Sequence, residues 1–164
     1  MSEPGPAPNP FWDYSLARYE RPGVAEACIG LQDRLGADVN VLLFCCWAGH
    51  RGHRLSAEQL GRLLDASRPW QRDIVEPLRQ VRRQLKPQAG ESKEIEALRG
   101  RVKALELESE RIAQAQLQSC LPLDEGRSSR HAVAANLQLY VESLPVRLGD
   151  SDHVALALLH EAGG

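Results

Sequence analysis

Long apolar runs are missing from this sequence, and no stretch approaches the roughly 20 residues that a membrane-spanning helix needs. The first ten residues, MSEPGPAPNP, also lack the basic and apolar regions of a signal peptide. Four of these ten residues are proline, so we expect residues 1–10 to form a disordered tail. The sequence therefore predicts a cytoplasmic protein with no membrane partner.

Motifs that carry chemistry are missing as well. The glycine patterns GxGxxG and the P-loop do not occur, nor does a nucleophile elbow or a DDxxD pair for magnesium. Ser, His and Asp are present, but no activating context frames them. His153, His160 and Glu161 are isolated polar residues of the kind found on helix surfaces. We therefore predict a non-catalytic protein, with no cofactor and no catalytic residue.

Four cysteines form no CxxC pair, which indicates reduced thiols in the cytosol. Two of them, Cys45 and Cys46, lie in the segment FCCWAGHRGHR, residues 44–54. Cys46 and His50 are four residues apart, so with His53 they are the candidate ligands of a metal site. The cysteines, however, belong to a continuous apolar run, where free cysteine behaves as a small buried hydrophobe. We favour a buried helix that runs into a basic turn, with no metal.

What the sequence does contain is helical periodicity, with apolar residues three and four apart. Ser56 and Gln59 form a capping box, and Pro69 is well placed to open a helix that ends near Lys86. In that helix Pro77 should produce a kink. The apolar residues expected to form its buried stripe are Trp70, Ile74, Leu78, Val81 and Leu85.

The fold class predicted from this pattern is all-α: a compact bundle of about five short helices, a longer charged helix, and one or two C-terminal helices. We expect a helical core over residues 11–86 and a linker over 87–92. Residues 93–164 then supply the charged helix and the C-terminal helices, which pack on the core to make one domain overall.

The charged helix over residues 93–119 shows the spacing of a coiled-coil seam. Glu, Lys and Arg flank that seam. A helical hairpin and a dimer both fit, so the predicted partner is another protein or a second copy of this chain. The seam residues are Ile95, Leu98, Val102, Leu105, Ser109 and Ile112.

Charge is distributed unevenly, although the net charge is only −2. Residues 50–86 carry nine Lys and Arg against four Asp and Glu, a net charge of +5, which leaves −7 for the remainder. A basic face could bind nucleic acid or an anionic ligand. It could equally be solvated, or pair with the glutamates of the charged helix. No nucleic-acid motif accompanies it. The residues of this basic face are Arg68, Arg72, Arg79, Arg82, Arg83 and Lys86.

Four aromatic residues lie beside arginines and are candidates for a ligand or peptide groove: Phe11, Trp12, Tyr14 and Trp70. Aromatics of this kind more often anchor a terminal helix onto a small core, and we favour that interpretation.

Two segments carry a family resemblance. FWDYSLARYERPGVAEACIGLQ and RPWQRDIVEPLRQVRRQLK match the patterns FWxxSLxxYxRPGVxxACxxLQ and RPWQRxxVxPLRxxRRxLK. The chain thereby resembles an uncharacterised proteobacterial family of conserved hypothetical proteins, over about residues 10 to 145. The resemblance implies an intact bacterial cytoplasmic protein and supports the helical fold. It implies no activity, so the predicted role is a macromolecular interaction or regulatory module.

Overall fold

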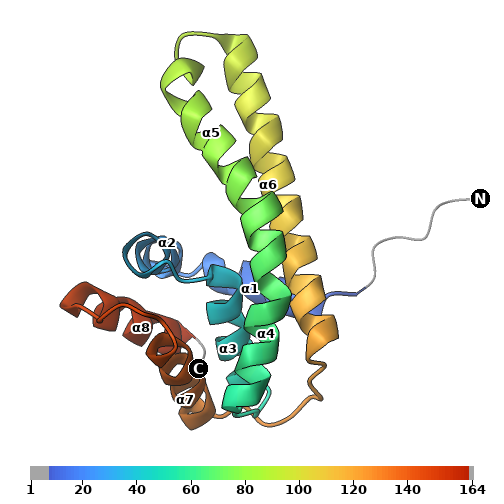
Figure 1. Cartoon of the computed structure of the whole chain (residues 1–164), viewed down its shortest axis with the longest axis vertical. Coiled ribbons are helices and arrows are strands. Elements are labelled where there is room, and N and C mark those ends of the chain that lie inside the picture. Colours follow the sequence, from blue (N-terminus) through green and yellow to red (C-terminus); the bar gives the residue numbers. More distant parts are fainter. Residues whose placement is uncertain (1–7, 163–164) are drawn as a thin grey trace, which may run out of the picture. The chain divides into compact units, whose positions relative to one another are not determined.

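The computed structural model describes residues 8–162, which contain helices and no strand (Figure 1). The predicted all-α fold is therefore confirmed. The predicted tail lies largely outside the described residues, and the chain is already helical at Pro10. In chain order the elements are α1 (Pro10–Tyr19), α2 (Val24–Leu35), α3 (Val39–His50), α4 (Ala57–Trp70), the π-helix η1 (Gln71–Val75), α5 (Glu76–Ala89), α6 (Lys93–Cys120), α7 (Arg130–Glu142) and α8 (Asp150–Ala162).

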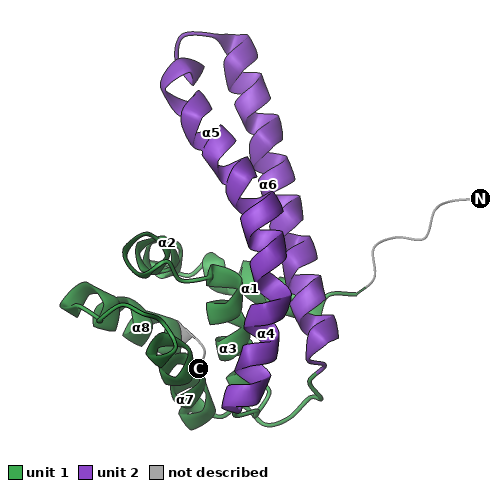
Figure 2. Cartoon of the chain, in the orientation of Figure 1, with its two compact units in different colours: residues 1–55, 123–164 green, residues 56–122 purple. Residues whose placement is uncertain are grey.

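The chain divides into two compact units (Figure 2). Unit 1 comprises the described residues up to Leu55 and from Leu123 on, and unit 2 comprises Ser56 to Pro122. The sequence predicted a helical core over residues 11–86, a linker over 87–92 and one domain overall. In the structure α5 and α6, which flank residues 90–92, belong to the same unit and pack against each other.

Unit 1 is built around α3, which packs most extensively against α7. Every residue from Asn40 to Gly49 is buried, as expected for a helix with no polar face. The two helices approach closely at Gly49, where a Cβ atom would lie 2.5 Å from the backbone nitrogen of Val133. Only glycine permits that approach without a shift of the backbone. Elsewhere in unit 1, α2 packs against α8.

The buried side chain of Asn136 on α7 secures the segment that follows α3. Its carbonyl oxygen accepts a hydrogen bond from the backbone nitrogen of Leu55 at 2.8 Å. Its amide nitrogen donates to the carbonyls of Cys45 at 3.1 Å and His53 at 2.9 Å. A buried amide with all its partners in place fixes one arrangement of the surrounding chain.

The turn at the end of α3 is held against residues 123–129, the segment that leads into α7. Its Gly52 has a φ of 83°, which glycine adopts without strain. The predicted basic turn of FCCWAGHRGHR is therefore a junction between two distant stretches of unit 1. Its hydrogen bonds run from Ser129 N to Gly49 O at 3.0 Å, from Arg51 Nη2 to Leu123 O at 3.2 Å, and from His53 Nε2 to Asp124 O at 2.8 Å.

Unit 2 is a helical hairpin in which α4, η1 and α5 follow one another without a break and pack along α6. The predicted capping box at Ser56 and Gln59 opens α4. Pro69, expected to start a new helix, lies inside α4 instead. Pro77 lacks an N–H to donate to the preceding turn, and the wider π-turn of η1 lies immediately before it.

The π-turn changes which residues of α5 face α6. Ile74 and Val81, expected in the buried stripe, are 37% and 45% exposed. Val75 is fully buried and Arg79 is only 7% exposed. A π-turn contains more residues than an α-turn, so it rotates the following side chains around the helix axis. The predicted stripe is wrong at Ile74 and Val81 for this reason.

Candidate functional site

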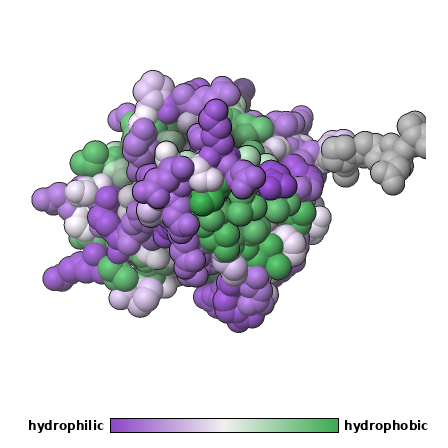
Figure 3. All heavy atoms as spheres, turned by 90° about the horizontal axis from the view of Figure 1, so that it is seen from above, coloured by the Kyte–Doolittle hydropathy of each residue, from purple (hydrophilic) through white to green (hydrophobic). Residues whose placement is uncertain are grey.

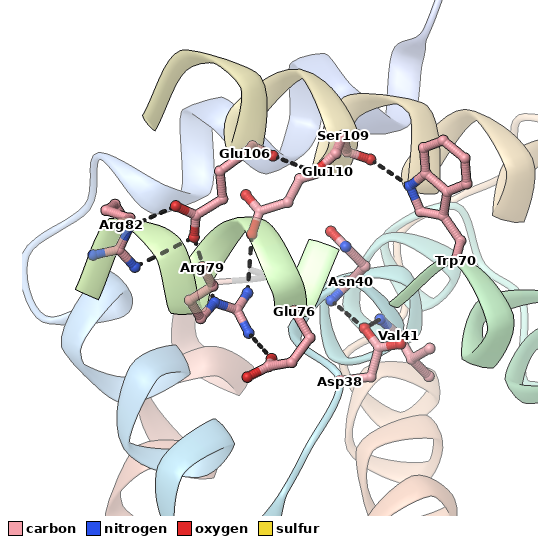
Figure 4. A network of polar contacts seen from close by, with 10 residues as sticks. All are labelled: Asp38, Asn40, Val41, Trp70, Glu76, Arg79, Arg82, Glu106, Ser109 and Glu110. Carbon is pink, nitrogen blue, oxygen red and sulfur yellow. Dashed lines mark hydrogen bonds and ion pairs between the residues drawn. The ribbon is translucent and has the colours of Figure 1, made fainter. Parts of the chain in front are cut away.

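Five charged side chains of α5 and α6 form one cluster in unit 2 (Figure 4). The guanidinium of Arg79 contacts three carboxylates: Glu76 at 2.9 Å, Glu106 at 3.4 Å and Glu110 at 3.3 Å. Arg82 Nε also binds Glu106, at 2.5 Å. Two arginines of the predicted basic face thus pair with glutamates of the charged helix.

This charge cluster is largely removed from water, since the side chains of Arg79 and Glu106 are only 9% and 11% exposed. Burial raises the pKa of Glu110, an effect that Arg79 opposes and Glu106 reinforces. Burial would by itself lower the pKa of Arg79, but the carboxylates around it raise that pKa above its usual value. Buried charges of this kind persist only when paired, so the cluster fixes the register of α5 on α6.

The rest of the predicted basic face is more exposed. Arg68 pairs with Asp65 at 3.4 Å, and Arg72 pairs with Asp73 at 2.8 Å, in both cases with side chains more than half exposed. Arg83 and Lys86 are exposed. Four of the six residues predicted to bind an anion therefore already contact carboxylates in the structure.

The middle of α6 presents apolar and small residues to solvent. Leu98, Leu105 and Leu107 are 42%, 53% and 51% exposed, whereas Val102 is buried. Only part of the predicted coiled-coil seam is therefore buried within the hairpin. Val102 and Ser109 are buried, whereas Leu98 and Leu105 are exposed to solvent. We call this surface the α6 apolar face. It consists of Ala97, Leu98, Gly100, Ala104 and Leu105, all of them exposed; Leu107, two residues after Leu105, points to the opposite side of the helix.

The candidate metal ligands lie in unit 1. Cys46 is buried, and burial raises the pKa of its thiol to about 12. His53 Nε2 is engaged with the carbonyl of Asp124. Among residues 8–162 no group of three or more His, Cys, Asp or Glu side chains could hold a metal ion. The ring of His50 lies against Tyr14 instead, with 5.5 Å between ring centroids.

The four candidate groove aromatics are divided between the two units. Phe11 is fully buried in unit 1, where its ring lies 5.2 Å from the rings of both Phe44 and Trp47. Phe11 therefore anchors α1 onto α3. Trp70 belongs to unit 2, where its indole nitrogen donates to the carbonyl of Ser109 at 2.8 Å.

These features define an all-α protein with a salt-bridged helical hairpin. None of the helices among residues 8–162 is both long and apolar enough to cross a membrane. Residues 10–117 match the model of a family described as a protein of unknown function (DUF2390), and the chain belongs to that family. No curated protein and no solved structure matches this chain.

The sequence already indicated the 93–119 helix, with Leu98 and Leu105 in its seam, as a surface for a partner. One grouping in the structure was not predicted from the sequence. It lies where α1 meets the end of α3, and it brings Arg18 and His50 to the ring of Tyr14. The spacing of Tyr14 and Arg18, four residues apart on one helix, is the only part of it that the sequence contains.

Proposed function

We propose that this protein is a non-catalytic interaction module that binds an amphipathic helix of another protein on the α6 apolar face. The single observation that carries this proposal is the exposure of Leu98 and Leu105, at 42% and 53%, two turns apart on one side of α6. Contiguous exposed apolar surface on a folded protein is typical of an interaction site. Apolar residues also reach the surface between hydrophilic ones in Figure 3.

The spacing of the leucines fits a helix as the occupant. Leu98 and Leu105 are seven residues apart, which is two turns of a helix and one coiled-coil repeat. The small residues Ala97, Gly100 and Ala104 beside them let a second backbone come close, and a Cβ atom on Gly100 would meet nothing within 4 Å.

Charge indicates which helix would bind. The exposed charged residues on this side of α6 are Glu94, Arg101 and Glu108, each three or four residues from a member of the α6 apolar face. An occupant that carries charges of both signs beside its apolar stripe would complement them. We favour a different protein over a second copy of this chain as that occupant. The proposal retains a cytoplasmic location in a bacterium.

Nucleic acid remains the alternative partner through the basic face. It receives less support, since Arg68, Arg72, Arg79 and Arg82 all contact carboxylates. Binding of phosphates there would have to compete with those contacts, and affinity would fall steeply with salt.

Site-specific photocrosslinking in the native cell tests the proposal. A photoreactive residue replaces Leu105 in one variant and the exposed Gln116 of the same helix in the other. We expect Leu105, and not Gln116, to crosslink to a different protein, at an amphipathic helix. Leu98→Glu should abolish that crosslink, whereas Val154→Glu, at the 70% exposed residue of α8, should leave it intact.

The other outcomes reject the proposal. Crosslinks between two copies of the chain would replace the partner by self-association. A product that nuclease removes would favour the nucleic-acid alternative. Equal labelling from both positions, or none from Leu105, would show that the α6 apolar face is simply solvated.

A further inference from the structure

Three polar atoms in unit 1 are buried without a well-formed hydrogen bond, and they belong to neighbouring side chains. They are Tyr14 Oη, Arg18 Nη1 and His50 Nδ1, none of which makes a hydrogen bond of good geometry among the described residues. The side chain of Arg18 lies near enough to the Tyr14 hydroxyl to lower its pKa, but burial outweighs that effect. Arg18 is only 8% exposed. Buried polar groups are nearly always paired, so a group of orphaned atoms in one place calls for an explanation.

Tyr14 lies at the centre of this group. Arg18 follows it by one helical turn in α1, and the Cζ atom of Arg18 lies 4.8 Å from the centroid of the tyrosine ring. The imidazole of His50, the last residue of α3, lies 5.5 Å from the same centroid and is tilted by 37°. Tyr14 therefore joins the side chains of Arg18 and His50 into one group.

Burial is the main influence on the pKa of the Tyr14 hydroxyl, and the positive charges of Arg18 and Arg21 oppose it. No carboxylate is among the groups that shift this pKa. Burial raises the pKa of the Tyr14 hydroxyl above its usual value, so the phenol remains protonated and can donate. Cys46 likewise stays a neutral thiol, since burial raises its pKa to about 12.

These atoms are mostly donors. A guanidinium can only donate, a phenol donates readily, and an imidazole nitrogen donates in one of its tautomers. A water molecule could accept some of these bonds but would leave the charge of Arg18 uncompensated. A metal cation is disfavoured by the same charge. An oxyanion satisfies the donors and neutralises the arginine together.

We propose that Tyr14, Arg18 and His50 form a binding site for a small oxyanion, a carboxylate or phosphate group carried by a small molecule. The stacked aromatic rings of Phe11 and Trp47 hold α1 on α3, so the donors are presented by a preformed corner of unit 1. This site is separate from the α6 apolar face, which belongs to unit 2.

The test is an NMR titration of the full chain with inorganic phosphate and, separately, with acetate. The reporter is the imidazole of His50, and the exposed His131 of α7 is the control. We expect a saturable shift at His50 with at least one anion and none at His131. The anion that binds more tightly identifies the chemical class of the natural ligand.

Matched variants distinguish specific binding at these three side chains from non-specific attraction of anions to a positively charged surface. Tyr14→Phe removes one oxygen and should weaken binding about tenfold, as expected for a hydrogen bond to a charged group. Arg18→Met should abolish the saturable shift, and the exposed Arg130→Met should not change it. If Arg18→Met fails to fold, the anion affinity of Tyr14→Phe still tests whether the site exists. An unchanged affinity in Tyr14→Phe, or a His50 resonance that responds to neither anion, would overturn the proposal.

Discussion

Replacement of Arg79 by methionine should destabilise unit 2 strongly. The substitution leaves Glu106 with Arg82 alone, and Glu76 and Glu110 lose their contacts with the guanidinium. Removal of one partner from a buried ion pair typically costs about 3–5 kcal/mol, and we expect the lower end because Arg82 remains. Unpaired Glu110 should then have a still higher pKa, since Arg79 now opposes the effect of burial.

The double variant Arg79→Met with Glu106→Met separates pairing from simple packing. Apolar side chains in place of a buried ion pair are often tolerated, so the double variant should recover about 1–2 kcal/mol relative to Arg79→Met alone. Arg72→Met is the matched control, since its pair with Asp73 is more than half exposed on both side chains, and we expect no measurable change.

The assay is urea unfolding followed by circular dichroism, combined with hydrogen exchange of the α6 amides. The second measurement is needed because two units need not unfold in a single step. Amides of α6 around Glu106 should lose protection in Arg79→Met, while those of α3 should not. The reasoning would be refuted if Arg79→Met lowered the free energy of unfolding by less than about 1 kcal/mol. A double variant less stable than either single variant would also refute the view that this cluster fixes the hairpin.

Two further predictions concern Gly49 and Asp152 of unit 1, with Gly61 of unit 2 as the control for the first. Gly49→Ala should cost about 1–3 kcal/mol in urea unfolding, because its Cβ would meet the α7 backbone at 2.5 Å. Gly61→Ala, where a Cβ meets nothing within 4 Å, should instead stabilise α4 by roughly 0.5–1 kcal/mol, and equal effects would contradict the close approach. The hydrogen bond from the Gly149 amide, and then Arg34, lower the pKa of Asp152. Its stabilising contribution is therefore present above the unfolded pKa of about 3.9 and lost as the pH falls through the lower folded value. Thermal unfolding across that range should show a weaker acid dependence in Asp152→Asn, and an unchanged profile would argue against the contact.

Local signals allowed much of the fold to be predicted from sequence. The capping box at Ser56 and the glycine after Leu35 act within a few residues, and both lie where the sequence put them. The buried character of α3 followed from its lack of any polar residue after Asn40 until its end.

The remainder depends on geometry that sequence periodicity does not contain. The π-turn before Pro77 moved Arg79 from a predicted open face into a buried cluster. The pairing of α3 with α7 joins residues more than eighty positions apart, as in the contact of Asn136 with Cys45. The candidate oxyanion site depends on that same tertiary arrangement, because Arg18 and His50 come from different helices.

The insertion of unit 2 between the two parts of unit 1 affects how the chain can be synthesised and shortened. α3 leaves the ribosome apolar on every side, and α7, which covers it, emerges only after the whole hairpin has been made. Chaperones commonly bind such exposed apolar segments of incomplete chains. A chain cut at residue 117 would keep the entire matched family region and still lack α7 and α8. The boundary of sequence similarity is therefore not a boundary of unit 1, whose central helix α3 packs against α7 beyond it.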